Sequence, residues 1–257
     1  MKIVNLQQNS EEWFEFRQGK IGGSKLSKLY PKTMPRKDEI VAFCEEEDIS
    51  IDPKVTIDKI LAEMDPQEIG KMKSQQYKLD GFYQLLAERV SRPLTENDYA
   101  DRLNGQPFSY MARGHILEPE ALEKFKEHTG KKTTGEKNVW VSDENSDIYV
   151  SPDDSIKEGD KYVEAIEVKC PSSHVFLRAW HENTYPKEYE EQVRQYFIVN
   201  QDLKILHFVL YTDLIPSLPL QVFEVTREQI ADDLDKYLSF EKSILKQIDE
   251  LSEQLAF

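Results

Sequence analysis

The chain has 257 residues, 32% of them charged, and its 33 basic and 48 acidic side chains give a formal net charge of -15. No apolar run approaches the ~20 residues that cross a bilayer, and the first residues lack the apolar core of a signal peptide. Cys44 and Cys170 are too few for a disulfide framework or an iron–sulfur cluster. We therefore expect a cytoplasmic protein, whose length fits one enlarged α/β domain as readily as two small ones.

Two short helices are predicted near the N-terminus. Residues 10–18 begin with a capping serine and end before Gly19, and the Gly-Gly-Ser segment at 22–24 opens the second helix. With Ser24 as the N-cap, the free backbone N–H groups of this helix would make an anion site that Arg17 could also reach. The simpler alternatives are a plain helix cap for Ser24 and a surface ion pair with a nearby glutamate for Arg17.

Residues 31–75 are interrupted by prolines, and we interpret them as an insertion into the domain. Short helices are predicted within this segment at 37–46 and 56–64. A clearer helix is predicted at 75–91, because its apolar residues recur at helical spacing and would form one packing face.

A further helix is predicted at 113–129, where apolar residues again recur at helical spacing. Pro119 is unfavourable inside a helix, so we expect the helix to begin at Pro119 or to bend just after Glu118. Either geometry places Glu118 near a helix entrance, where it could face a cleft. The helix dipole alone also explains an acidic residue in a first turn.

The centre of the chain is predicted to form strands. They are expected at 138–142, 148–151 and 162–169, and a turn through the cluster at 157–160 reverses the chain before the last of them. The first arm of this hairpin-like unit ends in the Ser-Pro-Asp-Asp segment at 151–154. The two arms therefore bring their side chains close together.

The strand at 162–169 combines an acid and a base. Its side chains alternate between two faces, so its apolar residues point to a core, whereas Glu167 and Lys169 share the opposite face with Ala165. Asp153 on the neighbouring arm would lie beside this charged pair. The sequence thus predicts a compact Asp, Glu and Lys constellation.

Such a constellation suits metal-dependent hydrolysis of a phosphodiester. Hard cations such as Mg2+ take oxygen ligands, keep several waters and are usually held by one or two protein carboxylates. The metal would activate a bound water, and the lysine could position or deprotonate that water and stabilise developing charge. Glu-x-Lys pairs are common on solvated strands, so the spacing alone favours a surface pair. The flanking Ser-Pro-Asp and Cys-Pro segments reverse that preference.

A helix at 189–199 is predicted to carry polar side chains toward the same site. Gln192 and Tyr196 fall one turn apart on one face, with Gln195 beside them. An amide could hydrogen-bond a phosphate or a metal-bound water. We take Gln192 as the functional residue, although the residues alone leave Gln195 as an alternative.

The remaining elements are predicted to complete the sheet and to end in a long helix. The segment after residue 171 is expected to be a loop with three candidates for contact with a substrate: His174, Arg178 and Trp180. Strands are expected at 204–211 and 221–225. The Thr-Arg-Glu-Gln segment at 226–229 is a capping box, which opens an amphipathic helix at about 227–254.

These motifs resemble a known nuclease family. Asp153 followed by Glu167-Val168-Lys169 looks like the PD-(D/E)XK nuclease core. The Ser-Pro-Asp segment followed by Glu-Val-Lys-Cys-Pro resembles the phage-type subgroup of that superfamily, the lambda exonuclease or YqaJ-type viral recombinase family.

Three further segments carry the resemblance in the order expected for the family. Residues 13–24 resemble its W-x-x-x-R-x-G-x-I-x-x-S pattern, and residues 112–114 with Glu118 resemble its ARG-x-x-x-E helix. Gln192 with Tyr196 is similar to the Q-x-x-x-Y element of RecB-like nucleases. The resemblance spans roughly residues 11–200.

The resemblance implies an α/β fold with a restriction-endonuclease-like PD-(D/E)XK core, in which helices flank a central mixed β-sheet, as a single nuclease domain over residues 1–257. It implies that Mg2+, or Mn2+, is held by Asp153, Glu167, the Val168 carbonyl and Glu118. Lys169 would orient the nucleophilic water, and Gln192 would assist. The implied contacts with the terminal 5'-phosphate are Arg17, Ser24 and Ser151. The sequence itself adds Arg178 and Arg194 as basic residues that could contact DNA near the site.

The implied function is a 5'-to-3' exonuclease on double-stranded DNA ends, which leaves 3' overhangs for phage-type recombination in a bacterial cytoplasm. The resembled enzyme implies a homotrimer ring around DNA and a single-strand annealing protein as a partner. Since the net charge of -15 opposes binding to DNA, we expect an acidic exterior with a locally basic channel.

Several activities are disfavoured by missing motifs. The chain lacks the G-x-x-x-x-G-K-[ST] loop, so we expect no nucleotide cofactor, and its five histidines lack the spacing of a helical zinc motif. Two alternatives stay open. One is a structure-specific or restriction-like endonuclease with the same core, and the other is a non-catalytic DNA-binding or scaffold protein.

Overall fold

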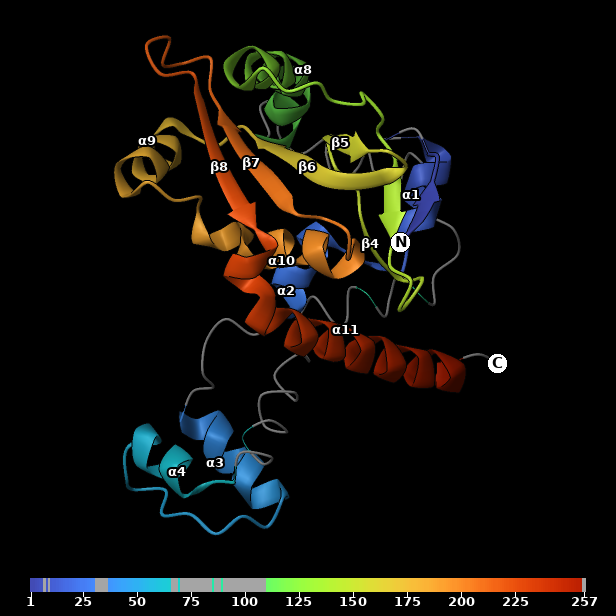
Figure 1. Cartoon of the computed structure of the whole chain (residues 1–257). Coiled ribbons are helices and arrows are strands. Elements are labelled where there is room, and N and C mark those ends of the chain that lie inside the picture. The colour runs from blue at the N-terminus through green and yellow to red at the C-terminus, as the bar shows by residue number, and fades with distance from the viewer. Residues whose placement is uncertain are drawn as a thin grey trace.

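The computed structural model describes residues 1–6, 8, 10–30, 37–65, 69, 85, 89 and 110–255. In this part of the chain, helices flank two four-stranded mixed sheets (Figure 1). The first sheet has the order β1-β3-β4-β2, with β1 at Lys2–Val4, β2 at Ile21–Gly22, β3 at Val139–Val141 and β4 at Ile148–Val150. The second has the order β5-β6-β7-β8, with β5 at Asp154–Glu158, β6 at Lys161–Lys169, β7 at Ile205–Tyr211 and β8 at Leu220–Thr226.

The prediction of one central sheet is therefore corrected to two. The chain leaves the first sheet at the end of β4 and enters the second at the start of β5, through the segment Ser151, Pro152 and Asp153. Pro152 has no N–H to donate to a neighbouring strand, so ladder pairing is interrupted there. The same interruption puts Asp153 at the boundary between the sheets.

Helices cover both faces of the second sheet. In Figure 1, α8 (Tyr110–Thr129) lies over one face, and α10 (Glu190–Val199) lies against the other. The other helices are α1 at Glu11–Arg17, α2 at Gly23–Leu29, α3 at Lys37–Glu46, α4 at Ile57–Glu63, α9 at Ser173–Glu182 and α11 at Arg227–Leu255, with a 3-10 turn at Lys187–Tyr189. Among the described residues, no helix combines the length and the apolar character that crossing a membrane requires.

The strand β6 is packed on both faces. Ile166 and Val168 point to a core, as predicted, and lie in one apolar cluster with the buried residues of α8. On the opposite face, Ala165 lies in the main core with side chains of α10. Glu167 shares that face and is only 4% exposed. The charged pair of β6 is therefore enclosed by protein rather than displayed on a solvated surface.

The start of α2 corrects one prediction. Its N-cap is Gly22, and Ser24 lies in the first helical turn instead of capping it. A Cβ atom on Gly22 would lie 2.6 Å from the ring of Tyr149, so only glycine allows the chain to pass this ring. This close approach fixes where the extended segment ends and the helix begins.

The segment after Pro171 corrects another prediction, since it forms the helix α9 and not a loop. Its apolar residues Phe176 and Ala179 are buried, and Asn183 ends the helix in the left-handed conformation at φ 50. The amide of Gln221 on β8 donates a 2.9 Å hydrogen bond to the carbonyl of Phe176. Short helices depend on such packing more than on intrinsic propensity, and a single sequence does not display the packing partner.

The helix α8 begins at Tyr110 and continues through Pro119, in contrast to a start at that proline. Pro119 has no N–H to donate to the carbonyl of His115, four residues earlier, so one helical hydrogen bond is missing at this turn. A buried stripe from Leu117 to Phe125 packs on β6 and β7 and stabilises the helix despite this loss.

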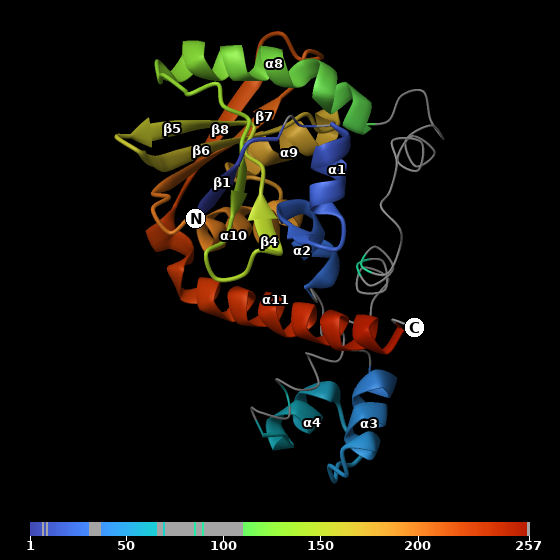
Figure 2. The same cartoon turned by 90° about the vertical axis from the view of Figure 1, so that its right-hand side faces the viewer.

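The helices α3 and α4 confirm the two short helices that were predicted in residues 31–75. They share a small apolar cluster, and both views place them apart from the two sheets (Figures 1 and 2). That the segment is an insertion stays a prediction. The expected helix at 75–91 lies outside the described residues except for Leu85 and Arg89, and Leu85 is buried in the main core.

The C-terminal helix α11 packs across α10 and confirms the predicted amphipathic helix (Figure 2). At its start, the Thr226 N–H donates a 2.8 Å hydrogen bond to the Gln229 side chain, as expected for a capping box. Further along, the buried Glu241 accepts a 2.5 Å hydrogen bond from the amide of Gln195 on α10. Burial raises the pKa of Glu241 to about 8, against the opposing effect of this hydrogen bond.

This carboxyl makes stability depend on pH. The folded pKa is about 8 and the ordinary value is 4.5, so the stability linked to the neutral form is fully present below pH 4.5 and is lost as the pH rises through 8. Glu241→Gln cannot ionise and should be more stable than the wild type at pH 9 by about 2–4 kcal/mol. Urea unfolding at pH 5 and pH 9 measures this, and equal pH dependence in both proteins would contradict it.

Candidate active site

Asp153 is held at the junction of the two sheets by the backbone of β6. Its N–H donates a 3.0 Å hydrogen bond to the carbonyl of Ile166, and its Oδ2 accepts a 2.7 Å bond from the Val168 N–H. These two bonds flank Glu167 in the sequence. The carboxylates of Asp153 and Glu167 are therefore held in one small region by main-chain geometry.

Glu167 is oriented by three side chains. Its Oε1 accepts hydrogen bonds from the Lys169 ammonium and from the Gln192 amide, the latter at 2.7 Å, and its Oε2 accepts one from the Tyr196 hydroxyl. Gln192 and Tyr196 lie one turn apart on α10, so both reach down to the same residue of β6. With both oxygens held, the carboxylate has a defined direction.

The cluster carries more negative charge than its surroundings neutralise. Burial, together with the charges of Glu167 and Glu118, raises the pKa of Asp153 well above its ordinary value. Burial lowers the pKa of Lys169, but the Glu167 and Asp153 carboxylates outweigh it and the pKa is raised. Burial and the Glu167 charge also raise the pKa of Tyr196 well above 10. Lys169 and Tyr196 therefore keep their protons at neutral pH.

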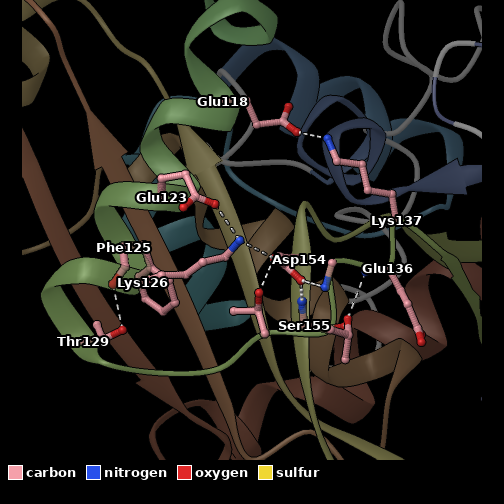
Figure 3. A network of polar contacts seen from close by, with 12 residues as sticks. Glu118, Glu123, Phe125, Lys126, Thr129, Glu136, Lys137, Asp154 and Ser155 are labelled. Atoms are coloured by element: carbon pink, nitrogen blue, oxygen red, sulfur yellow. Dashed lines mark hydrogen bonds and ion pairs between the residues drawn. The ribbon is translucent and has the colours of Figure 1, made fainter.

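Glu118 projects from α8 toward the same region and is 13% exposed on its side chain. Its Oε1 forms an ion pair with the Nζ of Lys137 at 2.5 Å, and Lys137 lies just before β3 (Figure 3). The loop that carries Lys137 is anchored by Asp154, whose carboxylate accepts a 2.9 Å bond from the Gly135 N–H. The two adjacent aspartates thus have different roles: Asp153 lines the cleft, and Asp154 holds the loop that carries Lys137.

Two hollows meet at these side chains. One has a volume of about 600 Å³ and extends toward α9, and the other has a volume of about 190 Å³ and extends toward α1 and α2. The side chains that line both hollows are His115, Glu118, Asp153, Glu167 and Lys169. The acids and the lysine therefore lie where the two hollows join into one cleft.

The smaller hollow contains the predicted anion-binding residues. Arg17, Ser24 and Ser151 all line it. The Arg17 guanidinium lies 3.9 Å from the centre of the Trp13 ring, and its Nε donates a 2.8 Å bond to the Tyr149 hydroxyl. A cation and two hydroxyls thus face the same small space beside the acids.

Other predicted residues are not brought to the cleft. Arg194 pairs with Asp233 of α11 at 3.1 Å, and Arg178 is exposed on α9 and lines neither hollow. Gln195 is buried against Glu241, whereas Gln192 contacts Glu167. Residues 194 and 195 face α11 because each step along a helix turns a side chain by about 100°.

Sequence reasoning missed one residue that lines the cleft, His115, and one that pairs with a cleft residue, Lys137. His115 precedes Glu118 by three positions, and this helical spacing could have indicated a shared face. Lys137 left no local signal, because it meets Glu118 from a separate segment. Tyr196 was identified in its motif but was given no role in the site.

The donor set fits a hard divalent cation. Among the described residues, no three His, Cys, Asp or Glu side chains form a ready-made metal cage. Mg2+ does not need one, because it keeps most of its waters and uses one or two carboxylates. The raised pKa of Asp153 marks negative charge that a cation would neutralise. Asp153 and Glu167 therefore suit Mg2+ or Mn2+.

Comparisons with a family model and with solved structures show which proteins this chain resembles. The YqaJ-like viral recombinase domain model matches residues 12–202. The chain is similar to a solved alkaline exonuclease, LHK-Exo from Laribacter hongkongensis, with a TM-score of 0.62 and 18% identity, over 96% of this chain and 98% of that one. The structure of LHK-Exo in complex with dAMP gives a TM-score of 0.61 at the same identity and coverage. At this identity the likeness shows the fold alone. No curated protein matches the sequence.

The charge imbalance predicts how Asp153→Asn behaves. Asparagine keeps an acceptor for the Val168 N–H but removes the charge. Because the pKa of Asp153 is raised, its ionised form destabilises the fold as the pH rises through that pKa. Without divalent ions at pH 8, the variant should be more stable by about 1 kcal/mol or more. Thermal unfolding in EDTA measures this.

Added Mg2+ provides the control for the same variant. It should raise the unfolding temperature of the wild type, since a cation that binds only the folded state stabilises it. The unfolding temperature of Asp153→Asn should not respond. A variant that is less stable in EDTA and still responds to Mg2+ would contradict the assignment of this carboxylate.

Proposed function

The chain belongs to the YqaJ-like viral recombinase family, and we propose that it is a Mg2+-dependent 5'-to-3' exonuclease on double-stranded DNA ends. It would leave 3' overhangs for phage-type recombination in the cytoplasm of a bacterial host. The observation that carries this proposal is the convergence of Asp153, Glu167 and Lys169 at the floor of one cleft. The fold shared with an alkaline exonuclease supports it.

In the proposed site, Asp153 and Glu167 hold the cation, with the Val168 carbonyl and Glu118 as further oxygen donors. Bound Mg2+ supplies neutralisation of phosphate charge and a water of lowered pKa. Glu118 is paired with Lys137, so Glu118 could bind the cation only if this ion pair lengthened or broke.

The remaining side chains orient the nucleophilic water and the Glu167 carboxylate and stabilise negative charge. Lys169 keeps its proton, which favours orienting the nucleophilic water and stabilising negative charge over deprotonating that water. Gln192 and Tyr196 fix the direction of the Glu167 carboxylate. An exonuclease needs this fixed geometry because misplacement of the reacting atoms by about 1 Å can cost 10²-fold in rate.

The net charge of -15 does not exclude DNA, because binding depends on where the basic residues lie. Arg17 and Lys169 line the smaller hollow, and Lys25 donates a 3.2 Å hydrogen bond to the Arg17 carbonyl. With Ser24 and Ser151, Arg17 would hold a terminal 5'-phosphate. Once a bound cation neutralises the acids, these basic side chains would make the cleft attractive to phosphate on a protein that is acidic elsewhere.

Cleavage assays test the proposed activity directly. Asp153→Ala or Glu167→Ala should reduce cleavage of end-labelled linear duplex in Mg2+ by orders of magnitude, because few carboxylates hold the cation. Lys169→Ala should be nearly as damaging but should retain Mg2+ binding.

The substrate separates the alternatives in the same assay. Closed circular DNA should resist the wild type, whereas an endonuclease would cut it. No cleavage of any DNA would favour a binding or scaffold protein. Near wild-type rates in the carboxylate variants would exclude the proposed site.

The smaller hollow predicts a preference for the 5' end. Wild-type protein should degrade duplex with a 5'-phosphate faster than the same duplex with a 5'-hydroxyl. Arg17→Ala should remove the preference, because the terminal phosphate loses its cation. Initial rates on the two labelled substrates measure this, with Arg178→Ala as a matched control that keeps the preference. Equal wild-type rates on both ends would rule out the pocket.

We further propose that the protein acts as a homotrimer ring threaded by DNA and hands its product to a single-strand annealing protein. A net charge of -15 gives weak long-range attraction to DNA, so continuous digestion needs enclosure to prevent escape. Light scattering at micromolar concentration should give three times the 30.1 kDa mass of one chain. A monomer that degrades long DNA without release would contradict enclosure.

A further inference from the structure

His115 occupies the junction of the two hollows without a role in the proposed site. It lines both hollows together with Glu118, Asp153, Glu167 and Lys169. Its side chain is exposed, and within the described part of the chain it makes no hydrogen bond or ion pair. Of the side chains at the junction, it alone is an imidazole.

The fold of α8 explains this placement. His115 and Glu118 are three residues apart and share a face of the helix, while Leu117 and Leu122 are buried against the sheet. Pro119 leaves the His115 carbonyl without its helical donor and allows this turn to deviate from a regular helix. The imidazole is therefore presented to the cleft from the side opposite α10.

Hydrolysis of a phosphodiester requires a proton at the leaving oxygen. Release of a terminal nucleotide by a 5'-to-3' exonuclease forms a bond between water oxygen and phosphorus and breaks the bond between phosphorus and the 3'-oxygen. The bonding electrons pass to the 3'-oxygen, which leaves more readily when a cation neutralises its charge or a general acid protonates it. General acids of this kind contribute about 10²–10⁴-fold to rate.

The other groups at the junction are poor proton donors. Lys169 holds its proton because neighbouring carboxylates raise its pKa. Glu118 is paired with Lys137 and is a further proposed donor to the cation, and Asp153 and Glu167 are its main proposed ligands. Histidine is the side chain that most often transfers a proton in general acid–base catalysis.

We propose that His115 is a catalytic residue, which donates its proton to the 3'-oxygen that leaves the scissile phosphate. This inference rests on the proposed exonuclease function. The proton that the attacking water loses passes to solvent, and the imidazole is reprotonated from solvent before the next cleavage. In the proposed function the terminal 5'-phosphate lies in the smaller hollow, so the linkage to the second nucleotide would lie toward the junction that His115 lines.

A sulfur substitution at the leaving atom tests the inference. Two duplexes carry a 5'-phosphate and differ only at the first linkage, which has either the natural 3'-oxygen or a bridging 3'-sulfur. A thiolate leaves without a proton, so it does not need a general acid. Single-turnover rates are measured with enzyme in excess and the same divalent ion for wild type, His115→Ala, His128→Ala and Asp153→Ala.

His115→Ala should cleave the oxygen linkage about 10²-fold more slowly than the wild type. It should cleave the sulfur linkage at a rate close to that of the wild type. His128→Ala, which changes an exposed histidine at the other end of the same helix, should match the wild type on both. Asp153→Ala should lose both activities, because it removes a proposed ligand of the cation.

Two results would overturn the role of His115. Equal slowing on both linkages would mean that it contributes to binding or to structure, and no slowing on the oxygen linkage would mean that it has no role in the reaction. If the wild type cleaves neither linkage, the proposed exonuclease function fails and the inference fails with it. The two failures are therefore distinguishable.

Discussion

The main constraint on this structure is that two carboxylates of like charge are held in one enclosed place. Asp153 lies at the boundary between the two sheets and Glu167 lies on β6, whose backbone fixes Asp153 through the carbonyl of Ile166 and the N–H of Val168. Burial and the charges of Glu167 and Glu118 raise the pKa of Asp153, and the charge of Lys169 offsets this only in part. A protein tolerates such a cluster when the surrounding packing is strong enough to impose it.

That packing comes from both sides of the second sheet. The helix α8 covers one face with a continuous apolar stripe, while α10 covers the other and supplies the Gln192 and Tyr196 hydrogen bonds to Glu167. In turn α11 supports α10, where the buried Glu241 accepts a hydrogen bond from Gln195. The two faces of α10 thus have different partners. Gln192 and Tyr196 contact Glu167 in the cleft, and Gln195 contacts Glu241 on α11.

The two hollows of the cleft are arranged in a way that fits the proposed cleavage of a DNA strand next to its 5' end. The smaller hollow has a cation and two hydroxyls at one end and the acids at the other, which suits a terminal phosphate adjacent to a bond that is cut. The larger hollow leaves room for the rest of a strand. With a cation bound to the acids, the proposed function would let an acidic protein bind a polyanion at this one place.

The sequence determined the features that depend on near neighbours along the chain. Alternation on a strand placed Glu167 and Lys169 on one face, helical spacing placed Gln192 beside Tyr196, and a capping box opened α11. These relations follow from the geometry of one strand or one helix. The family motifs reinforced them, and the family match over residues 12–202 confirmed the resemblance.

Only the tertiary structure decided which segments meet. The ring of Tyr149 requires glycine at position 22 and so moves the start of α2, and packing on the sheet turns the segment after Pro171 into a helix. The pairing of Glu118 with Lys137 and the place of His115 at the junction join separate elements. No local pattern encodes such contacts, because they arise from the packing of surfaces that are distant in the sequence.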